Sequence, residues 1–277
     1  MKAEGTALVT GASRGIGRAV TLELARRGFD VVASMRDPAA GSGLPASLEA
    51  GSIRVSTLDV TRPESIEIPD GLRVLVNNAG IEGPYLPVEN APMELWRDMF
   101  ETNVFGLVEV TRRAIPVLRA NRGGVLCNIT SCSTLLPVPF FAAYRASKAA
   151  VSAIGESLRT ELAPFGIRIL DIQPGAIDTD MLAGSQRPPE AIGCDGYQTL
   201  GEQVLATRQA SKEQFTPADE AARAIADAIL DDQTPLRFGC DPMGAGILEA
   251  WRNSDDETMM GGMLKLFAPP EAPEDAS

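Results

Sequence analysis

Short runs of apolar and β-branched residues recur along the chain, separated by longer stretches with helical spacing. The runs lie at residues 7–9, 31–33, 53–58, 74–76, 125–129 and 167–172, and the helical stretches at 16–27, about 92–120, 142–162 and 217–230. Runs without alternation of apolar and polar residues are typical of strands buried on both faces. Strands of this kind that alternate with helices predict an α/β fold with a doubly wound parallel sheet and right-handed crossovers.

A single domain is the simplest organisation for the 277 residues, which show no internal repeat. We expect it to span residues 1–267. Residues 181–215 include Pro188, Pro189 and several glycines and are too long for a simple helix-to-strand connection, so we expect a lid over a substrate site, with short helices of its own. Residues 268–277, rich in proline, alanine and acids, are expected to form a disordered, solvated tail.

The charge and the missing histidines exclude several classes of function. A net charge of −12 disfavours binding to nucleic acid or to an anionic membrane, and no apolar run reaches the length of a membrane span. The chain contains no histidine, which excludes Ser-His-Asp and Cys-His nucleophiles and a His-ligated zinc; we expect no metal site. The four cysteines form no CxxC pair, and the first strand pattern begins near Ala7. We therefore expect a reduced, cytoplasmic compartment and no secretory signal.

Tyr144 and Lys148 lie four residues apart in a predicted helix, so their side chains are neighbours on one face of it. The phenol of a free tyrosine has a pKa of about 10. A nearby ammonium group favours the phenolate. Ser131 follows a predicted strand and can hold a substrate oxygen while Tyr144 gives or takes a proton. Taken alone, the Tyr/Lys pair also arises by chance on helix surfaces, where tyrosine covers apolar surface and lysine is solvated.

A glycine-rich turn follows the first predicted strand and opens the first predicted helix. It runs from Thr10 to Gly17, with glycines at positions 11, 15 and 17. Backbone N–H groups and the helix N-terminus at such a turn bind anions such as a pyrophosphate. The G-x-x-x-G-x-G spacing differs from the common G-x-G-x-x-G fingerprint, and a plain tight turn is the alternative.

The second predicted strand ends at Met35 and Arg36. At this point of a dinucleotide site an acid binds the ribose 2′-hydroxyl of NAD, whereas an arginine accommodates the 2′-phosphate of NADP. Arg36, together with Arg14 in the first turn, therefore favours NADP. Two alternatives involve Asp37: it pairs with a solvated Arg36, or it turns inward and binds a free ribose hydroxyl.

Six motifs lie in order over about residues 5–240: Thr10–Gly17, Asn77–Gly80, Asn103, Ser131, Tyr144 with Lys148, and Pro174–Thr179. Together they resemble the motifs of the short-chain dehydrogenase/reductase family. The resemblance implies a one-domain Rossmann fold and hydride transfer between a nicotinamide and a carbonyl or alcohol. Residues 35–38 are similar to those of NADP-preferring hydroxysteroid and retinol members.

For the reaction, the resemblance implies that Tyr144 is the general acid/base, that Lys148 lowers its pKa and binds the nicotinamide ribose, and that Ser131 orients the substrate oxygen. Asn103 would bend its helix and hold a proton-relay water beside the lysine. The implied cofactor-binding residues are Gly11, Ser13, Arg14, Gly15, Ile16, Gly17, Arg36, Asp59, Val60, Asn78, Ala79, Gly80, Tyr144, Lys148, Pro174, Gly175, Ile177 and Thr179. A small-molecule substrate and a homodimer or homotetramer, paired through the helices at 92–120 and 142–162, are also implied.

The chain departs from the family pattern on the adenine side of the expected cofactor site. Residues between Met35 and Ile53, and between Asp59 and Asn77, leave room for little helix. The helix usual before the fourth strand must therefore be truncated, and the preceding connection must be short of helix as well.

Other functions share part of this pattern. An NADP(H)-binding regulator without turnover has no need of Ser131, Asn103, Tyr144 and Lys148 together. A 3-oxoacyl-thioester reductase would use the same set on another substrate, and a sugar-nucleotide epimerase usually has a larger C-terminal domain. Residues 135–141 and 181–182 are apolar. If they line the pocket, the substrate is an apolar ketone or secondary alcohol; otherwise they pack against the sheet edge.

Overall fold

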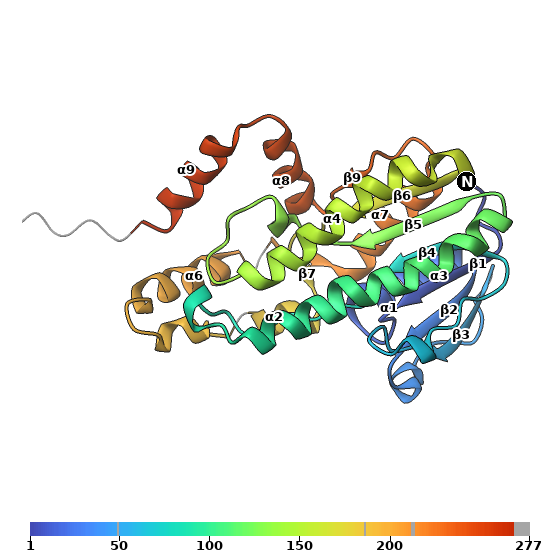
Figure 1. Ribbon diagram of the computed structural model, residues 1–277, viewed down its shortest axis with the longest axis horizontal. Helices are drawn as coiled ribbons and strands as arrows, with labels where there is room; N and C mark the ends of the chain where they lie inside the picture. Colours follow the sequence, from blue (N-terminus) through green and yellow to red (C-terminus); the bar gives the residue numbers. More distant parts are fainter. Residues whose placement is uncertain (49, 186, 212–213, 269–277) are drawn as a thin grey trace, which may run out of the picture.

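The central sheet of the computed structural model contains seven parallel strands within the residues that the structure describes, which are 1–48, 50–185, 187–211 and 214–268 (Figure 1). The strands are β1 (Thr6–Thr10), β2 (Asp30–Met35), β3 (Ser52–Thr57), β4 (Leu72–Asn77), β5 (Gly124–Ile129), β6 (Ile167–Ile172) and β9 (Arg237–Phe238). Their spatial order is β3-β2-β1-β4-β5-β6-β9, so the order reverses between β1 and β4. The predicted doubly wound sheet is confirmed. Two further short strands, β7 (Ile177–Asp178) and β8 (Thr216–Pro217), pair beside it.

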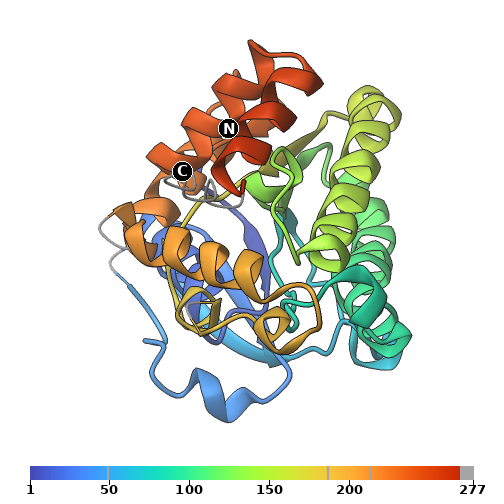
Figure 2. The same cartoon turned by 90° about the vertical axis from the view of Figure 1, so that its left-hand side faces the viewer.

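Helices cover both faces of the sheet (Figure 2). They are α1 (Gly15–Arg27), α2 (Met93–Phe100), α3 (Leu107–Ala120), α4 (Ala142–Leu162), α5 (Asp180–Ser185), α6 (Gln198–Ala210), α7 (Ala218–Leu230), α8 (Pro242–Arg252) and α9 (Asp256–Leu266). One apolar cluster joins α1 and α7 to the sheet, and a second joins α3 and α4 to its other face. Fully buried side chains such as Leu75 and Ile169 contribute roughly 1.5–3 kcal/mol each.

The first helix is bounded by glycines that adopt left-handed backbone conformations. Gly15, at φ 54°, closes the turn after β1, and Gly28, at φ 114°, ends α1 with its N–H donating to the carbonyl of Ala25. Because this conformation is costly for residues with a side chain, the two glycines fix where the helix starts and stops. The N-terminus of α1 therefore points at the carboxyl ends of the strands.

The helix expected over residues 92–120 is divided into three parts. A turn of π-helix, Glu101–Gly106, separates α2 from α3. The other three predicted helices agree with α1, α4 and α7 to within one residue. The sequence patterns did not predict α8 and α9, nor β9, which is only two residues long.

The connections beside β3 and β4 are short of helix, as expected. Among their described residues, the helical elements are the 3-10 turns η1 (Pro38–Gly41) and η2 (Pro63–Ser65). The segment 181–215 carries most of α5, the 3-10 turn η7 (Glu190–Gly193) and α6. Of the predicted tail 268–277, only Ala268 lies within the described residues, and its carbonyl accepts a 2.8 Å hydrogen bond from Gln203. In the described part of the chain, no helix combines the length and the apolar character needed to cross a bilayer.

Candidate active site

A cavity of about 440 Å³ opens where the order of the sheet reverses between β1 and β4. In open α/β sheets ligands bind in the crevice outside the carboxyl ends of the strands at such a point. Every predicted site residue except Gly17 and Asn103 lines this cavity: Gly11, Ser13, Arg14, Gly15, Ile16, Arg36, Asp59, Val60, Asn78, Ala79, Gly80, Ser131, Tyr144, Lys148, Pro174, Gly175, Ile177 and Thr179. One cavity thus brings together motifs from both halves of the sequence.

Tyr144 and Ser131 meet in the wall of this cavity. Tyr144 lies in the first turn of α4, Ser131 follows β5, and the serine hydroxyl lies close enough to the phenol to affect its pKa. Ser131 also caps the 3-10 turn after β5, because its hydroxyl accepts from the Ser133 N–H at 3.2 Å. The cap holds the serine hydroxyl in place beside the phenol.

Lys148 lies one turn of α4 beyond Tyr144 and is buried. Its Nζ donates to the carbonyl of Ile129 at 2.8 Å and lies 5.8 Å from the centroid of the Tyr144 ring. Burial lowers the pKa of Lys148 to about 8, and the negative charge of Asp171 opposes this shift. The lysine therefore titrates much closer to neutrality than a solvated lysine does.

The pKa of Tyr144 is raised above its usual value. Burial is the main cause, the negative charge of Glu82 adds to it, and the nearby Ser131 hydroxyl acts in the opposite direction. This differs from the expectation that Lys148 lowers the pKa of Tyr144. The phenol is enclosed and lies near a carboxylate, while the Lys148 ammonium is bonded to a carbonyl. The neutral, proton-carrying phenol is therefore the stable form at neutral pH.

Asn103 lies behind this wall, in the π-helical turn. Its Oδ1 accepts from the Ile81 N–H at 2.8 Å, and its Nδ2 donates to the Ile81 carbonyl at 2.9 Å and to Ser147 Oγ at 3.0 Å. A Cβ placed on Gly80 would lie 3.2 Å from Asn103 Oδ1 and 3.4 Å from Lys148 Nζ. Glycine at position 80 therefore leaves the space between the asparagine and the lysine open. π-turns of this kind occur frequently at functional sites.

The glycine-rich turn forms the opposite end of the cavity. A Cβ on Gly15 would meet Thr179 Cγ2 at 3.3 Å, so this glycine keeps the opening between the turn and the segment after β6. A Cβ on Gly17 would lie 2.4 Å from both Asn78 Nδ2 and the carbonyl of Gly11. Gly17 thus has a packing role behind the cavity wall. The open turn at a helix N-terminus suits a pyrophosphate, which supports dinucleotide binding.

Arg36 stands at the edge of the cavity beyond β2. Met35 is buried, whereas Arg36 is exposed and lines the cavity. Asp37 turns away, because its carboxylate caps η1 at 2.9 Å from the N–H of residue 39. Burial raises the pKa of Asp59, but hydrogen bonds from Thr61 and the positive charge of Arg36 outweigh it and lower that pKa overall. The cationic side chain thus lies close to the adenine end of the site.

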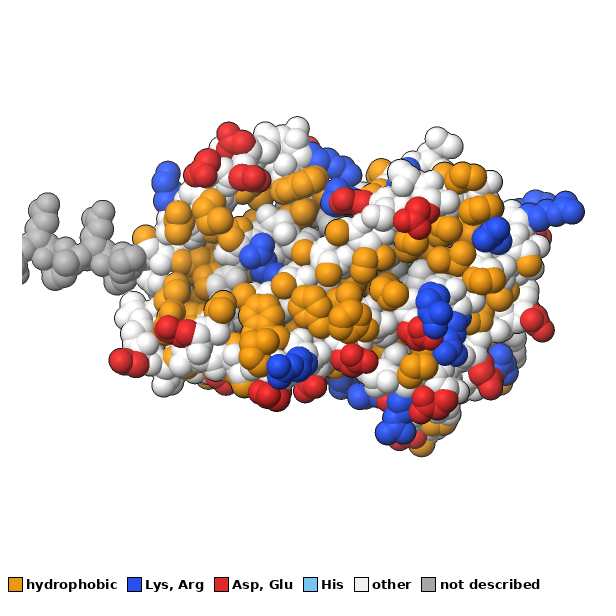
Figure 3. Space-filling view, viewed as in Figure 1, with side chains coloured by type: hydrophobic (Ala, Val, Ile, Leu, Met, Phe, Trp, Pro, Cys, Tyr) orange, Lys and Arg blue, Asp and Glu red, His pale blue; other side chains and the backbone are white. Residues whose placement is uncertain are grey.

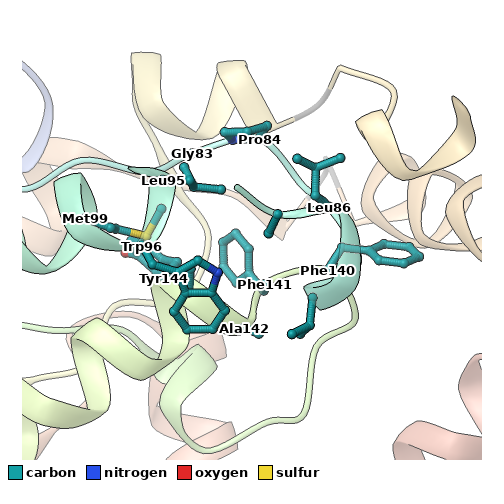
Figure 4. A pocket seen from close by; sticks show the side chains of 13 residues that line it. Gly83, Pro84, Leu86, Leu95, Trp96, Met99, Phe140, Phe141, Ala142 and Tyr144 are labelled. Carbon is teal, nitrogen blue, oxygen red and sulfur yellow. The ribbon is translucent and has the colours of Figure 1, made fainter. Parts of the chain in front are cut away.

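Apolar side chains line the other half of the cavity. They are Ile81, Val138, Phe141, Met181, Leu182, Phe215 and Met243. Within the apolar segment 135–141, Val138 and Phe141 face this cavity, and Phe140 lines a smaller pocket beside it, together with Trp96, Phe141 and Tyr144 (Figure 4). Phe140 adopts a φ of 64°, which is strained for a side chain of its size, and its ring packs 5.9 Å from that of Tyr197.

Sequence reasoning missed three side chains in the apolar half: Glu82, Tyr85 and Arg208. The Tyr85 hydroxyl donates to the Glu82 carboxylate, and the Arg208 guanidinium lies 3.8 Å from the centroid of the Tyr85 ring. Burial raises the pKa of Glu82 to about 7, against the lowering effect of Arg208 and Arg187. The only sequence signal was an acid two residues after Gly80, in the segment that follows β4. Nothing in the sequence around Glu82 distinguishes it from a glutamate exposed to solvent.

The described residues contain no group of three or more Cys, Asp and Glu side chains that could hold a metal ion. The sequence model of the short chain dehydrogenase family matches residues 5–190. The chain belongs to this family. It is therefore an oxidoreductase with a dinucleotide site, as the resemblance implied.

Relatives of this short-chain dehydrogenase include an uncharacterized oxidoreductase and an estradiol dehydrogenase. An uncharacterized oxidoreductase of Bacillus subtilis, YusZ, is 35% identical over 87% of this chain and 89% of its own length. Estradiol 17-beta-dehydrogenase 2 of Rattus norvegicus is 38% identical over 65% of this chain and 49% of its own length. The chain thus matches only about half the length of that relative.

A crystal structure of a short chain dehydrogenase from Burkholderia cenocepacia J2315 in complex with NADP has the same fold. The two share a TM-score of 0.76 and 27% sequence identity, over 97% of this chain and 100% of the other. The Rossmann fold expected from the resemblance is confirmed.

Proposed function

We propose that this short-chain dehydrogenase reduces an apolar ketone, or oxidises the corresponding secondary alcohol, with NADP(H). The observation that carries the proposal is the cluster of Ser131, Tyr144 and Lys148 at the junction of the cavity's two halves. One half has the glycine turn suited to a pyrophosphate, and the other has apolar walls suited to a carbon skeleton. A protein that only bound the nucleotide would need the first half alone.

The cofactor supplies or accepts the hydride, and the protein supplies position and a proton donor. Ser131 hydrogen-bonds the substrate oxygen. Tyr144 gives its phenolic proton to that oxygen during reduction and takes it back during oxidation. The positive charge of Lys148 stabilises the phenolate left after proton transfer, and its ammonium binds the nicotinamide ribose. Asn103 holds the water through which the proton is replaced.

The residues at the edge of the cavity support NADP(H) as the cofactor. Met35 presents no carboxylate to a 2′-phosphate, Arg36 offers a cation, and Asp37 is engaged at the start of η1. Charge-assisted hydrogen bonds are worth about 1.5–3 kcal/mol each. One such bond corresponds to roughly tenfold to a hundredfold in affinity.

Steady-state kinetics with a panel of carbonyls tests this assignment. The value of kcat/KM should be at least about tenfold higher with NADPH than with NADH. Met35→Asp combined with Arg36→Ala should reverse this order. Arg62→Ala is the matched control, because Arg62 is exposed and lies near Asp59 but outside the cavity wall. Equal values for the two cofactors, or a preference for NADH, would show that Arg36 does not govern the choice.

We propose that residues 181–215 form a lid over the substrate site, within one domain of residues 1–267. Contacts between this segment and the loop after β4 support that role. The Tyr85 N–H donates to Glu190 Oε2 at 2.9 Å, and the Ala191 N–H donates to the Tyr85 carbonyl at 3.0 Å. Met181, Leu182 and Phe215 from the same segment line the cavity. We expect this segment to cover the bound substrate.

Exposed apolar residues on the outer helices support the assembly of a homodimer or homotetramer. Met93 and Phe105 are 57% and 58% exposed, and Figure 3 shows hydrophobic side chains over the helices α2 to α4 that face the viewer. Burial of such residues between subunits stabilises an oligomer.

A further inference from the structure

Glu82 is a carboxylate in the apolar half of the cavity that the proposed reaction does not use. It follows the Asn77–Gly80 motif at the end of β4 and lines the same cavity as Tyr144. The Tyr85 hydroxyl donates to its Oε1, and no other described residue hydrogen-bonds the carboxylate. Carboxylates that border apolar surface without a full set of partners are rare, because their desolvation is costly. Because Glu82 lines the cavity, its carboxylate is accessible to a ligand there.

An aromatic wall connects Glu82 with the proposed reaction centre. The Tyr85 ring stacks on Phe141 at 5.0 Å, and Phe141 lies 4.8 Å from the Tyr144 ring. Phe141 itself faces the cavity, with Val138 beside it. Because Tyr144 also senses the charge of Glu82, the two groups belong to one site rather than to separate ones. A flat carbon skeleton lying along this wall would have Tyr144 at one end and Glu82 at the other.

The charges around Glu82 restrict what kind of polar group it can bind. Arg208 and Arg187 provide positive potential at the carboxylate. A substrate ammonium would be repelled by these arginines, and a substrate carboxylate would be repelled by Glu82 itself. A neutral hydroxyl avoids both penalties. It can donate to the ionised carboxylate, and it can accept from the protonated one.

We propose that Glu82 is a specificity-determining residue that binds a second hydroxyl group of the substrate, remote from the carbon that exchanges the hydride. The substrate class is then a neutral, mostly apolar cyclic ketone or alcohol that carries one further hydroxyl. This inference rests on the proposed function, because it takes Tyr144 as the other end of the site.

Binding of matched ligands to the enzyme–NADPH complex tests the proposal. The probes are trans-decalone and a set of hydroxydecalones in which the hydroxyl occupies each position of the second ring in turn. The Tyr144→Phe background slows turnover by about 10²–10⁴-fold. Calorimetry at about pH 8, where Glu82 is mostly ionised, then measures the Kd before much NADPH is consumed. At least one hydroxydecalone should bind about tenfold to a hundredfold more tightly than decalone, as one hydrogen bond to a charged group predicts.

Variants at Glu82 assign this preference to the carboxylate. Glu82→Leu should reduce the ratio of the two Kd values to about one, and Glu82→Gln, which keeps a hydrogen-bonding side chain, should retain part of it. Glu67→Leu removes an exposed glutamate outside the cavity and should leave the ratio unchanged. The proposal is overturned if no hydroxydecalone binds more tightly than decalone, or if the preference survives in Glu82→Leu. If the wild-type enzyme oxidises NADPH with none of the ketones, the proposed function is refuted instead. The binding assay distinguishes the two failures, because it does not depend on turnover.

Discussion

Replacement of Glu82 by glutamine should stabilise the folded protein at high pH and not at low pH. Burial raises the pKa of Glu82 from 4.5 to about 7. The folded protein therefore holds the proton more tightly than the unfolded chain does. Between these two values the folded state binds more protons, so the stability of the wild-type protein falls as the pH rises. Above about pH 7 the carboxylate is charged in both states, and the full cost of burying that charge is present.

The size of the pKa shift sets the size of the effect. At 1.36 kcal/mol per pH unit it corresponds to roughly 3 kcal/mol. Because Glu82 borders a cavity and keeps its bond with Tyr85, we expect about 2 kcal/mol in practice. For a chain of this length, that difference shifts Tm by roughly 4–6 °C.

Thermal and urea unfolding of the wild type and Glu82→Gln across about pH 5 to pH 8 measures the difference. The variant should match the wild type near pH 5 and become more stable than it as the pH rises through 7. Glu67→Gln, at an exposed position, should show no such trend. A stability difference that stays constant over this range, or one that favours the wild type at pH 8, would refute the account of Glu82 as a buried charge.

Two further predictions concern packing and assembly. Gly17→Ala should lower the free energy of unfolding by about 1–3 kcal/mol, because its Cβ would lie 2.4 Å from Asn78 Nδ2 and from the Gly11 carbonyl. Gly246→Ala in α8 is the control, because no atom lies within 4 Å of the added Cβ. Urea titration should show that this substitution leaves the free energy of unfolding unchanged or raises it. Equal effects of the two substitutions would contradict the packing argument. Sedimentation at micromolar concentration should show a dimer or a tetramer. Phe105→Glu should dissociate it, because Phe105 is 58% exposed on the outer helices. A wild-type protein that sediments as a monomer would exclude the interface.

Much of the fold could be predicted because its strands carry their own signal. Runs such as 125–129 are buried on both faces, so their composition alone distinguishes them from the amphipathic helices between them. β9 has no such signal: its two residues join the sheet only through pairing with β6. The resemblance implied a bend at Asn103, but the pattern over residues 92–120 reads as one long helix and did not predict that a π-helical turn divides it.

The candidate site was predictable where a motif lies within one segment, as Tyr144 and Lys148 do in α4. The Glu82–Tyr85–Arg208 group could not be predicted. It joins the loop after β4 to α6, and only the folded chain brings these segments together. The direction of the Tyr144 pKa was missed for the same reason, because burial and Glu82 set it and neither is visible in the spacing of Tyr144 and Lys148.

The central claim is that Tyr144 is the proton donor for carbonyl reduction by NADPH. The most direct test compares the wild type with Tyr144→Phe in a ketone-dependent NADPH oxidation assay, with NADPH binding measured in parallel by fluorescence. Removal of the hydroxyl should lower kcat by about 10²–10⁴-fold, the usual range for a general acid, while the Kd for NADPH stays within a factor of about three. A Tyr144→Phe enzyme that kept more than about a tenth of the wild-type kcat would contradict the claim.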